Sequence, residues 1–460
     1  MSQHLPIVYE KASSLTSDGR RNFVHPADVK GRFDRRRKIT FATLIALWAA
    51  LPWIEVGGHP AIFLDVAKRE FYLFGNTFNA QDFWLVFFLL SGTGFALIFV
   101  TALWGRIWCG YACPHTVFLE GVFRPIERLI EGPRQVRMRR NAGPFTFDKL
   151  WRKVLKHGVY LLMALLVAHV IISYFVSLPG LYEMVLSSPS EHPTAFAWAA
   201  SLTAALYFNF SWFREQLCLI ICPYGRLQSV LTDRDTLVIG YDEHRGEPRG
   251  KASDPEAGDC IDCKRCVVVC PTGIDIRNGL QIDCVGCARC VDACDEIMDK
   301  LGRERGLVRY DSLEGLEGKP SRVLRPRIYY YGVLGVMGLV AATLAFSSRH
   351  DFEANMMRLR GAPPFTVDGD SVRNAFEIHV VNKQSRTVTY RIEDASDGPE
   401  QYTIAMPRLT LRSLQSQRVP VFVSFPRGAV EDGSPATLRV VAEGDDGETL
   451  QVTSPLIAPN

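Results

Sequence analysis

All 12 cysteines of this sequence lie between Cys109 and Cys294, and the chain after Cys294 has none. A domain in this last part therefore has no disulfide framework and must be held together by a packed core. The sequence also lacks a G-x-G-x-x-G turn after a strand, which is the usual fingerprint of a dinucleotide site. Any nicotinamide or flavin cofactor must therefore be bound by a separate protein.

The N-terminal residues are polar through Ser17 and contain no apolar run, so we expect no cleavable signal peptide. Charge of one sign is not in large excess, because 52 Lys and Arg against 49 Asp and Glu give a net charge of +3. The charges are sorted by segment: basic stretches alternate with apolar runs of about twenty residues, which is typical of a polytopic membrane protein. Basic stretches beside such runs indicate topology, so we expect no nucleic-acid partner.

The apolar runs predict a membrane protein with five spans. We expect these spans at roughly 39–56, 82–105, 157–178, 194–213 and 327–347. Lys and Arg gather in the tail before the first span, the loop after the second and the segment after the fourth, whereas the other two loops hold only Lys68 and Arg69. By the positive-inside rule the basic parts are cytoplasmic, and an odd number of spans places the C-terminal part outside.

Eight cysteines form two runs of equal spacing, C-x2-C-x2-C-x3-C, at 260–270 and 284–294. This spacing is typical of bacterial two-cluster ferredoxins, in which the fourth cysteine of each run ligates the other run's [4Fe–4S] cluster. We therefore expect two clusters with crossed ligands. The first is assigned to Cys260, Cys263, Cys266 and Cys294, and the second to Cys284, Cys287, Cys290 and Cys270.

A pair of four-cysteine zinc sites is the alternative, since zinc sites also use the CxxC spacing. Zinc leaves the third cysteine of each run, Cys266 and Cys290, and the repetition of the run unexplained. Pro271 follows the first run whereas Asp295 follows the second. Proline is a packing residue at that position and not a ligand, so this departure does not affect the assignment.

The remaining four cysteines form two Cys-x3-Cys-Pro (CxxxCP) motifs, one after the second span and one after the fourth. They are Cys109 and Cys113, followed by Pro114, and Cys218 and Cys222, followed by Pro223. Two spans separate the copies, which indicates an internal repeat in one orientation. The spacing places both sulfurs of a pair on one helix face, and the Cys–Pro junction starts a new helix.

We therefore expect Cys113 and Cys222 at helix N-termini, where the dipole and a preceding arginine (Arg106 or Arg214) favour the thiolate. The two pairs can converge into one site at the membrane face, and soft thiolates select Cu(I), zinc or Fe–S. The alternative is that they are small buried residues at a helix break, which the duplication disfavours. The residues do not say which metal is bound.

Apolar residues alternate with polar ones at 376–380, 387–392, 419–423 and 438–441. Turn-forming clusters at 382–384, 397–399 and 445–447 separate these runs, and the pattern predicts an immunoglobulin-like β-sandwich without a cysteine pair. A similar alternation at 61–66 and 71–74 predicts a small surface hairpin between the first two spans.

This order of spans, CxxxCP motifs, tandem cluster runs and exported sandwich resembles the FixG/CcoG/RdxA family, accessory proteins of cbb-type cytochrome c oxidase. The resemblance covers nearly the whole chain. It implies a bacterial cytoplasmic membrane protein, with the N-terminus and clusters cytoplasmic and the C-terminal domain periplasmic. The domains would be a basic tail (1–38), a four-span membrane domain (39–235), a two-cluster ferredoxin-like domain (236–325), a fifth span (326–348) and the sandwich (349–460).

The resemblance further implies electron transfer in oxidase maturation, with reduction of Cu(II) to Cu(I) for copper delivery. Its partners would be oxidase subunits or copper-delivery proteins and a separate electron donor. The eight cysteines of the tandem runs would hold the clusters. Cys109, Cys113, Cys218 and Cys222 would be a copper or relay site.

Two alternatives remain at this point. The repeat of span and CxxxCP motif is also similar to NapH- and NosR-type subunits, which carry electrons between quinol and a periplasmic partner. That function needs a quinol pocket or a haem in the spans, for which His169 is the one candidate ligand, and a packing role suits His169 better. The other alternative is a non-catalytic assembly scaffold.

Overall fold

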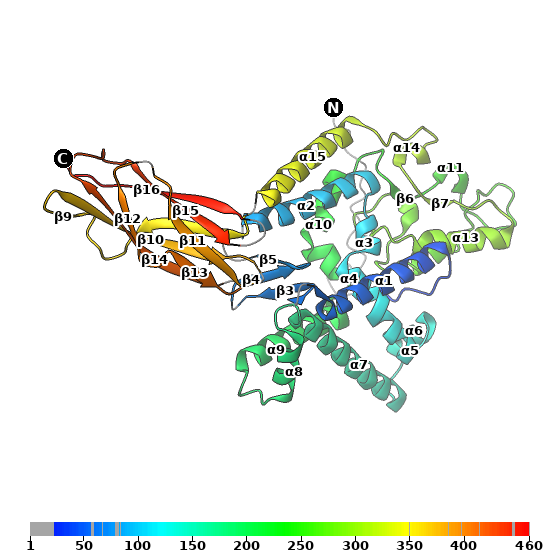
Figure 1. Ribbon diagram of the computed structural model, residues 1–460. Helices are drawn as coiled ribbons and strands as arrows, with labels where there is room; N and C mark the ends of the chain where they lie inside the picture. Colours follow the sequence, from blue (N-terminus) through cyan, green and yellow to red (C-terminus); the bar gives the residue numbers. More distant parts are fainter. Residues whose placement is uncertain are drawn as a thin grey trace. The chain divides into compact units, whose positions relative to one another are not determined.

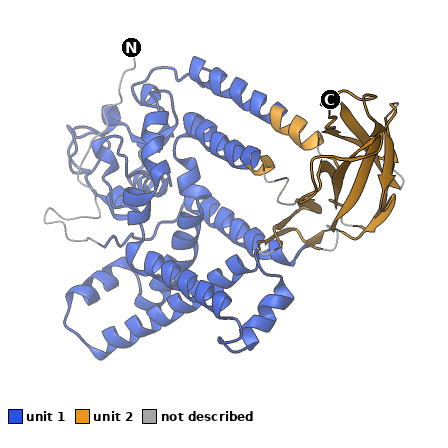
Figure 2. Ribbon diagram, turned by 90° about the vertical axis from the view of Figure 1, so that its left-hand side faces the viewer, with its two compact units in different colours: residues 1–54, 87–340 blue, residues 55–86, 341–460 orange. Residues whose placement is uncertain are grey.

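The protein is described from a computed structural model that covers residues 23–56, 59–66, 68–78, 82, 84–348, 350–384, 386–396, 398–413, 415–443 and 447–459. Most of the predicted tail 1–38 and parts of the predicted turns 397–399 and 445–447 lie outside these residues. The chain divides into two compact units (Figure 2). One contains residues 1–54 and 87–340, and the other contains residues 55–86 and 341–460.

The first unit is mainly helical (Figure 1). Its long helices are α1 (Arg32–Ala50), α2 (Trp84–Trp104), α7 (Phe147–Ile172), α9 (Pro193–Phe208) and α15 (Pro326–Ser347). Its shorter helices are α3 (Ile107–Tyr111), α4 (Pro114–Phe118), α5 (Arg124–Glu131), α6 (Arg134–Ala142), α8 (Leu178–Leu186) and α10 (Pro223–Leu231).

Three of the described helices, α2, α7 and α15, are long and apolar enough to cross a membrane. They correspond to the second, third and fifth predicted spans. The first and fourth predicted spans are also helical but do not reach this length and hydropathy. Helix α1 begins on the basic residues at Arg32, and α9 ends at Phe208, where the helix widens into a π turn (Asn209–Phe213).

The bounds of the third predicted span were wrong, because α7 begins at Phe147 and ends at Ile172. The Thr146 hydroxyl caps its N-terminus by accepting a hydrogen bond from the Lys149 amide at 3.3 Å. The Lys and Arg residues that follow are good helix formers, so the helix extends beyond its apolar part. The loop predicted at 179–193 contains α8.

The two cysteine runs belong to a segment of the first unit that is closed by two antiparallel strands, β6 (Val238–Tyr241) and β7 (Val308–Asp311). The first run leads into α12 (Arg265–Val268) and the second into α13 (Arg289–Leu301). Buried apolar residues from both strands and from α13, including Ile239, Val291 and Leu307, form the core behind the cysteines. This core fixes the two runs relative to each other.

The second unit contains the predicted β-sandwich. One sheet has the order β12-β14-β10-β8, with β9 on β10, and the other has the order β13-β11-β15-β16. The strands are β8 (Phe352–Arg358), β9 (Thr366–Asp368), β10 (Ser371–Asn382), β11 (Val388–Asp394), β12 (Gln401–Ile404), β13 (Arg408–Leu411), β14 (Ser416–Pro426), β15 (Pro435–Glu443) and β16 (Thr449–Pro455). The four predicted strand segments lie in β10, β11, β14 and β15, and their inward residues build the core.

The predicted surface hairpin is confirmed within the same unit. Strand β3 (Ile62–Asp65) pairs antiparallel with β4 (Glu70–Leu73), and β5 (Asn76–Phe78) extends the sheet. Lys383 of the sandwich forms an ion pair at 2.9 Å with Asp82, which follows the hairpin in the chain. The loop between the first two predicted spans therefore packs with the C-terminal domain.

Candidate metal centres

The two cysteine runs have the same backbone path. Lys264 and Ala288, each directly after the second cysteine of its run, have φ values of 54° and 58°. Asp262 and Gly286, each directly before that cysteine, also have positive φ, at 50° and 65°. A left-handed conformation is unfavourable for residues other than glycine, and it persists where the surrounding structure requires it. Each run therefore curls around the space that its cysteines enclose.

Four thiols meet at each of two cavities. The first cavity is lined by Cys260, Cys263, Cys266 and Cys294. The second is lined by Cys270, Cys284, Cys287 and Cys290, and Cys266 also contributes to its wall. Each cavity thus combines three cysteines of one run with the last cysteine of the other, which is the ligand set of a two-cluster ferredoxin.

Burial favours the neutral thiol at several of the cysteines around these cavities. Burial raises the pKa of Cys266, Cys284 and Cys294 to about 12. Loading of iron must therefore displace protons, as for any thiolate ligand. Cys263 is the exposed member of the set, whereas Cys260 and Cys266 beside it are buried.

Within the described part of the chain, no three His, Cys, Asp or Glu side chains converge closely enough to hold a single metal ion. Each cavity has four cysteines in its wall, and a cubane needs four thiolates that each bind a different iron, so it does not require three side chains to meet at one ion. The residues present therefore fit two [4Fe–4S] clusters.

The two CxxxCP motifs repeat one local geometry. Cys113 and Cys222 are the N-cap residues of α4 and α10, with Pro114 and Pro223 at the first helical position, as predicted. The amide of Cys113 donates to the Trp108 carbonyl at 2.9 Å, and that of Cys222 donates to the Leu217 carbonyl at 2.8 Å. Both bonds span five residues, and such π-type turns are frequent at functional sites.

The two copies contact each other. The Gln228 amide of α10 donates to the Cys109 sulfur at 3.4 Å. In the other direction, a ring nitrogen of His115, just after Cys113, lies 2.9 Å from the Arg214 carbonyl oxygen, just before Cys218. All four CxxxCP cysteines are free and half-buried. The repeat therefore brings both thiol pairs into one region.

The first cysteine of each pair, to which the thiolate expectation did not apply, lies in surroundings that disfavour the thiolate. Burial raises the pKa of Cys109 to about 11, although the Arg106 guanidinium acts in the opposite direction. Burial also raises the pKa of Cys218 well above its usual range, and the nearby Cys113 and Cys109 add to the shift. Arg214 lies away from the thiols, since both its terminal nitrogens donate to Glu127 at 3.1 and 3.2 Å.

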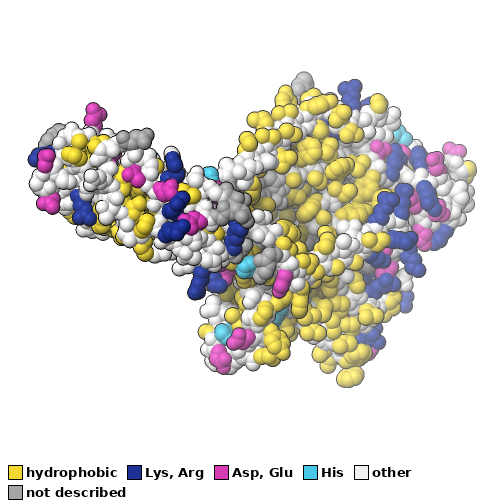
Figure 3. Space-filling model, viewed as in Figure 1, with side chains coloured by type: hydrophobic (Ala, Val, Ile, Leu, Met, Phe, Trp, Pro, Cys, Tyr) yellow, Lys and Arg dark blue, Asp and Glu magenta, His cyan; other side chains and the backbone are white. Residues whose placement is uncertain are grey.

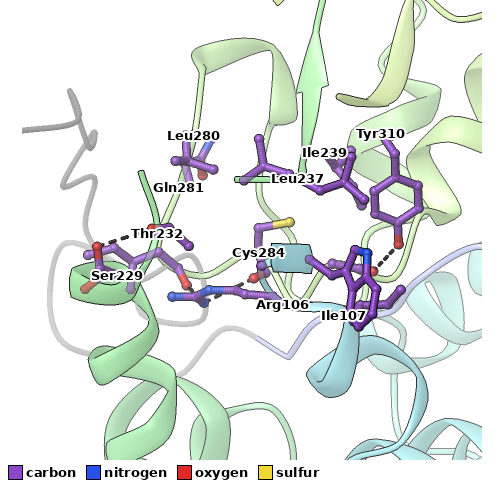
Figure 4. Close-up of a pocket in the computed structure, with 15 residues that line it drawn as sticks. Arg106, Ile107, Ser229, Thr232, Leu237, Ile239, Leu280, Gln281, Cys284 and Tyr310 are labelled. Carbon is purple, nitrogen blue, oxygen red and sulfur yellow. Dashed lines mark hydrogen bonds between the residues drawn. The ribbon is translucent and has the colours of Figure 1, made fainter. Parts of the chain in front are cut away.

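The first CxxxCP motif packs on the loop of the second cysteine run. Arg106 donates to the backbone carbonyls of Cys284, at 3.1 Å, and Ile282 (Figure 4). It also donates to the backbone carbonyl of Gly225 in α10, at 2.7 Å. The Tyr310 hydroxyl of β7 donates to the Gly286 carbonyl at 2.5 Å (Figure 4). A single arginine thus connects both CxxxCP copies to a predicted cluster ligand.

Sequence models of known families match three regions of the chain. The model of a 4Fe-4S dicluster domain matches residues 213–313, and that of a 4Fe-4S binding domain matches residues 84–133. The model described as an IG-like fold at the C-terminal of FixG matches residues 342–459.

Two curated relatives match most of the chain. The nitrogen fixation protein FixG of Rhizobium meliloti (strain 1021) is 35% identical, over 89% of this chain and 87% of its own length. The protein RdxA of Cereibacter sphaeroides is 36% identical, over 82% of each chain. The chain belongs to the FixG/RdxA family. This FixG/RdxA protein has matched iron–sulfur domains and three apolar helices. It is therefore a membrane iron–sulfur electron-transfer protein.

A solved FixG-related protein from Vibrio parahaemolyticus covers 24% of this FixG/RdxA chain and 100% of its own, at 14% identity and a TM-score of 0.21. So low a score supports no structural conclusion. The immunoglobulin-like fold of the C-terminal domain rests instead on its two sheets and on the family match to residues 342–459.

Sequence reasoning missed a buried charge network in this FixG/RdxA protein. Glu127 of α5 pairs with Arg214 at 3.1 Å and with Arg137 at 3.2 Å, and Lys156 lies 3.9 Å away. Although burial alone would raise it, these cations lower the pKa of Glu127 to about 2. The available signal was the placement of Glu127 among the many Lys and Arg residues of one loop, which we interpreted only as a mark of topology.

Proposed function

We propose that the protein transfers electrons to copper during assembly of cbb-type cytochrome c oxidase, reducing Cu(II) to Cu(I) for delivery. The observation that carries this proposal is the packing of the first CxxxCP motif on the Cys284 loop through Arg106. It links a thiol group suited to Cu(I) with a cavity suited to an iron–sulfur cluster. Clusters of this kind supply single electrons when bound.

The cysteine sets of the two cavities have different surroundings, which suggests the direction of electron transfer through the protein. Cys263 of the first set is exposed and can meet a soluble donor protein. The loop of the second set contacts α3, which carries Cys109, where Gly286 meets Gly110. We therefore infer that electrons from a separate donor enter beside Cys263 and leave beside Cys109.

The substrate step is a one-electron reduction. Cu(II) takes one electron from the reduced protein and becomes Cu(I), and the donor is oxidised by the same amount. Cys109, Cys113, Cys218 and Cys222 would bind the copper and favour its reduced form, because soft thiolates prefer Cu(I). The neutral thiols of Cys109 and Cys218 would release their protons to water as they bind.

A second candidate is that the CxxxCP cysteines hold a relay cluster instead of copper. The match of residues 84–133 to a 4Fe-4S binding domain favours it, because that region contains Cys109 and Cys113. Iron analysis separates the candidates: about eight irons per chain fit two clusters, and about twelve fit three. A quinol-linked role would need a quinol pocket or a haem in the spans, for which the sequence offers only His169, whose Nδ1 bonds to the Leu165 carbonyl oxygen at 2.8 Å.

We further propose the full five-span topology. Helix α9 continues through its π turn to Phe213, which gives about the length that a span needs, and α1 has an apolar second half. With both as spans, the N-terminus and cluster runs are cytoplasmic and the sandwich is periplasmic. The sandwich would then meet oxidase subunits or copper-delivery proteins.

The proposal is tested with anaerobically purified, chemically reduced protein and a chelator that absorbs only when it binds Cu(I). We expect stoichiometric Cu(II) reduction by the wild type. Replacing Cys109, Cys113, Cys218 and Cys222 with serine should abolish Cu(II) reduction while leaving about eight irons per chain. Unchanged Cu(II) reduction in this variant would exclude these cysteines from the function. A full-length chain whose assembly activity survives loss of all cluster iron would support the scaffold alternative.

A further inference from the structure

A basic cavity of about 550 Å³ with no cysteine in its lining lies within the first unit. Its walls come from the first turns of α1, from α5 and α6, and from the start of α13. Seven Lys or Arg side chains line it against three carboxylates. The lining therefore has a clear excess of positive charge, and the volume is that of a small-ligand site.

The three carboxylates balance only part of this charge. Glu120 binds Arg124 and also binds Arg289 at 3.0 Å, and Asp34 binds Lys38 at 2.6 Å. The third, Asp28, binds Arg128 at 3.0 Å. Two carboxylates outside the lining add a partner for Arg124, which is Glu215 at 3.1 Å, and for Arg137, which is Glu127 at 3.2 Å, whereas Lys30 and Arg37 have no ion pair among the described residues. An anion that entered the cavity would meet cations whose charge is not fully balanced.

Buried arginine donors in the lining have no hydrogen-bond partner among the described residues. They are Nη2 of Arg37 and the Nε atoms of Arg124, Arg137 and Arg289. Arg37, Arg137 and Arg124 are only 2%, 5% and 7% exposed. Buried polar groups are nearly always satisfied, and arginine recognises the oxygens of phosphate groups in particular. Several such donors around one cavity indicate a tetrahedral oxyanion.

The part of the cavity wall that α5 forms carries exposed apolar side chains. Helix α5 buries three of its four charged residues, Arg124, Glu127 and Glu131, and leaves Leu129 85% exposed beside the exposed Arg128. Pro125 and Leu129 line the cavity and are exposed. A helix with its apolar face outward suits lipid and not water. Figure 3 shows the basic side chains of this unit gathered along the border of its hydrophobic surface.

We propose that this cavity binds the phosphate of an anionic phospholipid headgroup. The buried arginines contact the phosphate oxygens, Lys38 and Arg128 lie at the exposed edge, and the acyl chains leave past Leu129. Basic pockets beside membrane helices are suited to anionic headgroups. Because α1, α5 and α13 all contribute to the walls, the lipid also ties the cluster-bearing segment to the membrane helices.

The test uses the full-length protein in detergent after removal of lipid, with thermal stability measured during titration. The probes are short-chain phosphatidylglycerol, phosphatidylcholine of the same chain length and glycerol phosphate. We expect phosphatidylglycerol to bind much more tightly than the other two. We also expect one phosphatidylglycerol per chain to remain on gently purified protein in native mass spectrometry.

The diagnostic variant is Lys38→Gln with Arg128→Gln, because both side chains are exposed and their loss does not threaten folding. Removing two cations should weaken phosphatidylglycerol binding by about tenfold or more. The matched control is Arg35→Gln with Arg36→Gln, which removes the same charge from exposed positions of α1 outside the cavity and should change nothing.

Three results would overturn the proposal. Equal binding of phosphatidylglycerol and phosphatidylcholine would exclude an anion site. Equal weakening by the diagnostic and control variants would reduce the effect to general surface charge. Glycerol phosphate binding as tightly as phosphatidylglycerol, with the same loss in the diagnostic variant, would assign the cavity to a soluble phosphate compound.

Discussion

The backbones of Gly110 and Gly286 lie in direct contact. A Cβ atom on Gly110 would stand 2.7 Å from the Gly286 carbonyl oxygen, and one on Gly286 would stand 2.9 Å from the Arg106 carbonyl oxygen. Neither distance is compatible with a side chain. Gly110 lies inside the first CxxxCP motif, and Gly286 lies inside the second cysteine run. This contact sets how closely the thiol pair approaches the second cavity.

One added methyl group should push the backbones of Gly110 and Gly286 apart. Gly110→Ala should lower the free energy of unfolding by about 1–3 kcal/mol through overpacking. It should also slow Cu(II) reduction severalfold, because the CxxxCP thiols move away from the cluster, while the iron content stays the same. Stopped-flow absorbance and iron analysis measure the two effects. Gly158→Ala is the control, since a Cβ there meets no atom within 4 Å. Equal rates in both variants would contradict the prediction.

The crossed ligand assignment predicts which pairs of cysteine changes act on one cluster. Cys270→Ser with Cys284→Ser should lose one cluster and keep about four irons. Cys270→Ser with Cys260→Ser should lose both clusters and keep almost none. Iron analysis together with EPR of the reduced protein distinguishes the two. If the two double variants show the opposite pattern, each run ligates its own cluster.

Glu127 should be among the most sensitive charged positions outside the cysteines. Glu127→Gln leaves Arg214 and Arg137 buried without their carboxylate, and breaking a buried ion pair costs about 3–5 kcal/mol. Thermal unfolding in detergent should show a large drop in apparent Tm. Glu296→Gln, which breaks one exposed pair with Lys300 on α13, should cost only about 0.3–0.5 kcal/mol. Similar drops in both variants would show that the buried network contributes little.

The same network predicts a stability profile in acid. Although burial acts in the opposite direction, nearby cations lower the pKa of Glu127 and Glu120 to about 2, from an ordinary value of 4.5. A carboxyl with a lowered folded pKa stabilises the protein above its unfolded pKa, and this contribution is lost as the pH falls from about 4.5 to about 2. Each shift corresponds to about 3 kcal/mol. Apparent Tm should therefore fall steeply over this range, and less steeply in Glu127→Gln; parallel profiles would argue against the assignment.

The sequence predicted the parts of this protein whose signals are local. Cysteine spacing predicted the groups of four cysteines that line the two cavities, and period-two alternation located β10, β11, β14 and β15. The first and last residues of the helices were less predictable. Hydropathy locates the apolar part of a helix, whereas its ends are set by hydrogen bonding and capping. The first turns of α7 are basic, yet they are helical because Thr146 caps them.

Contacts between distant segments could not be read from the sequence. Arg106 was interpreted as a partner of the nearby thiols, but its side chain reaches carbonyls far along the chain, at Cys284 and Gly225. One signal was present in the first CxxxCP motif, where Gly110 follows Cys109, whereas Leu219 follows Cys218 in the second. This asymmetry marks the copy that packs on the cluster loop.

Cys266 forms part of the wall of both cysteine cavities, so one side chain separates them. Two unpaired electrons held this close sense each other's magnetic fields. The fully reduced protein should therefore give an EPR spectrum that differs from the sum of its two singly reduced spectra. The tandem runs would then act as one coupled spin system and not as two independent carriers.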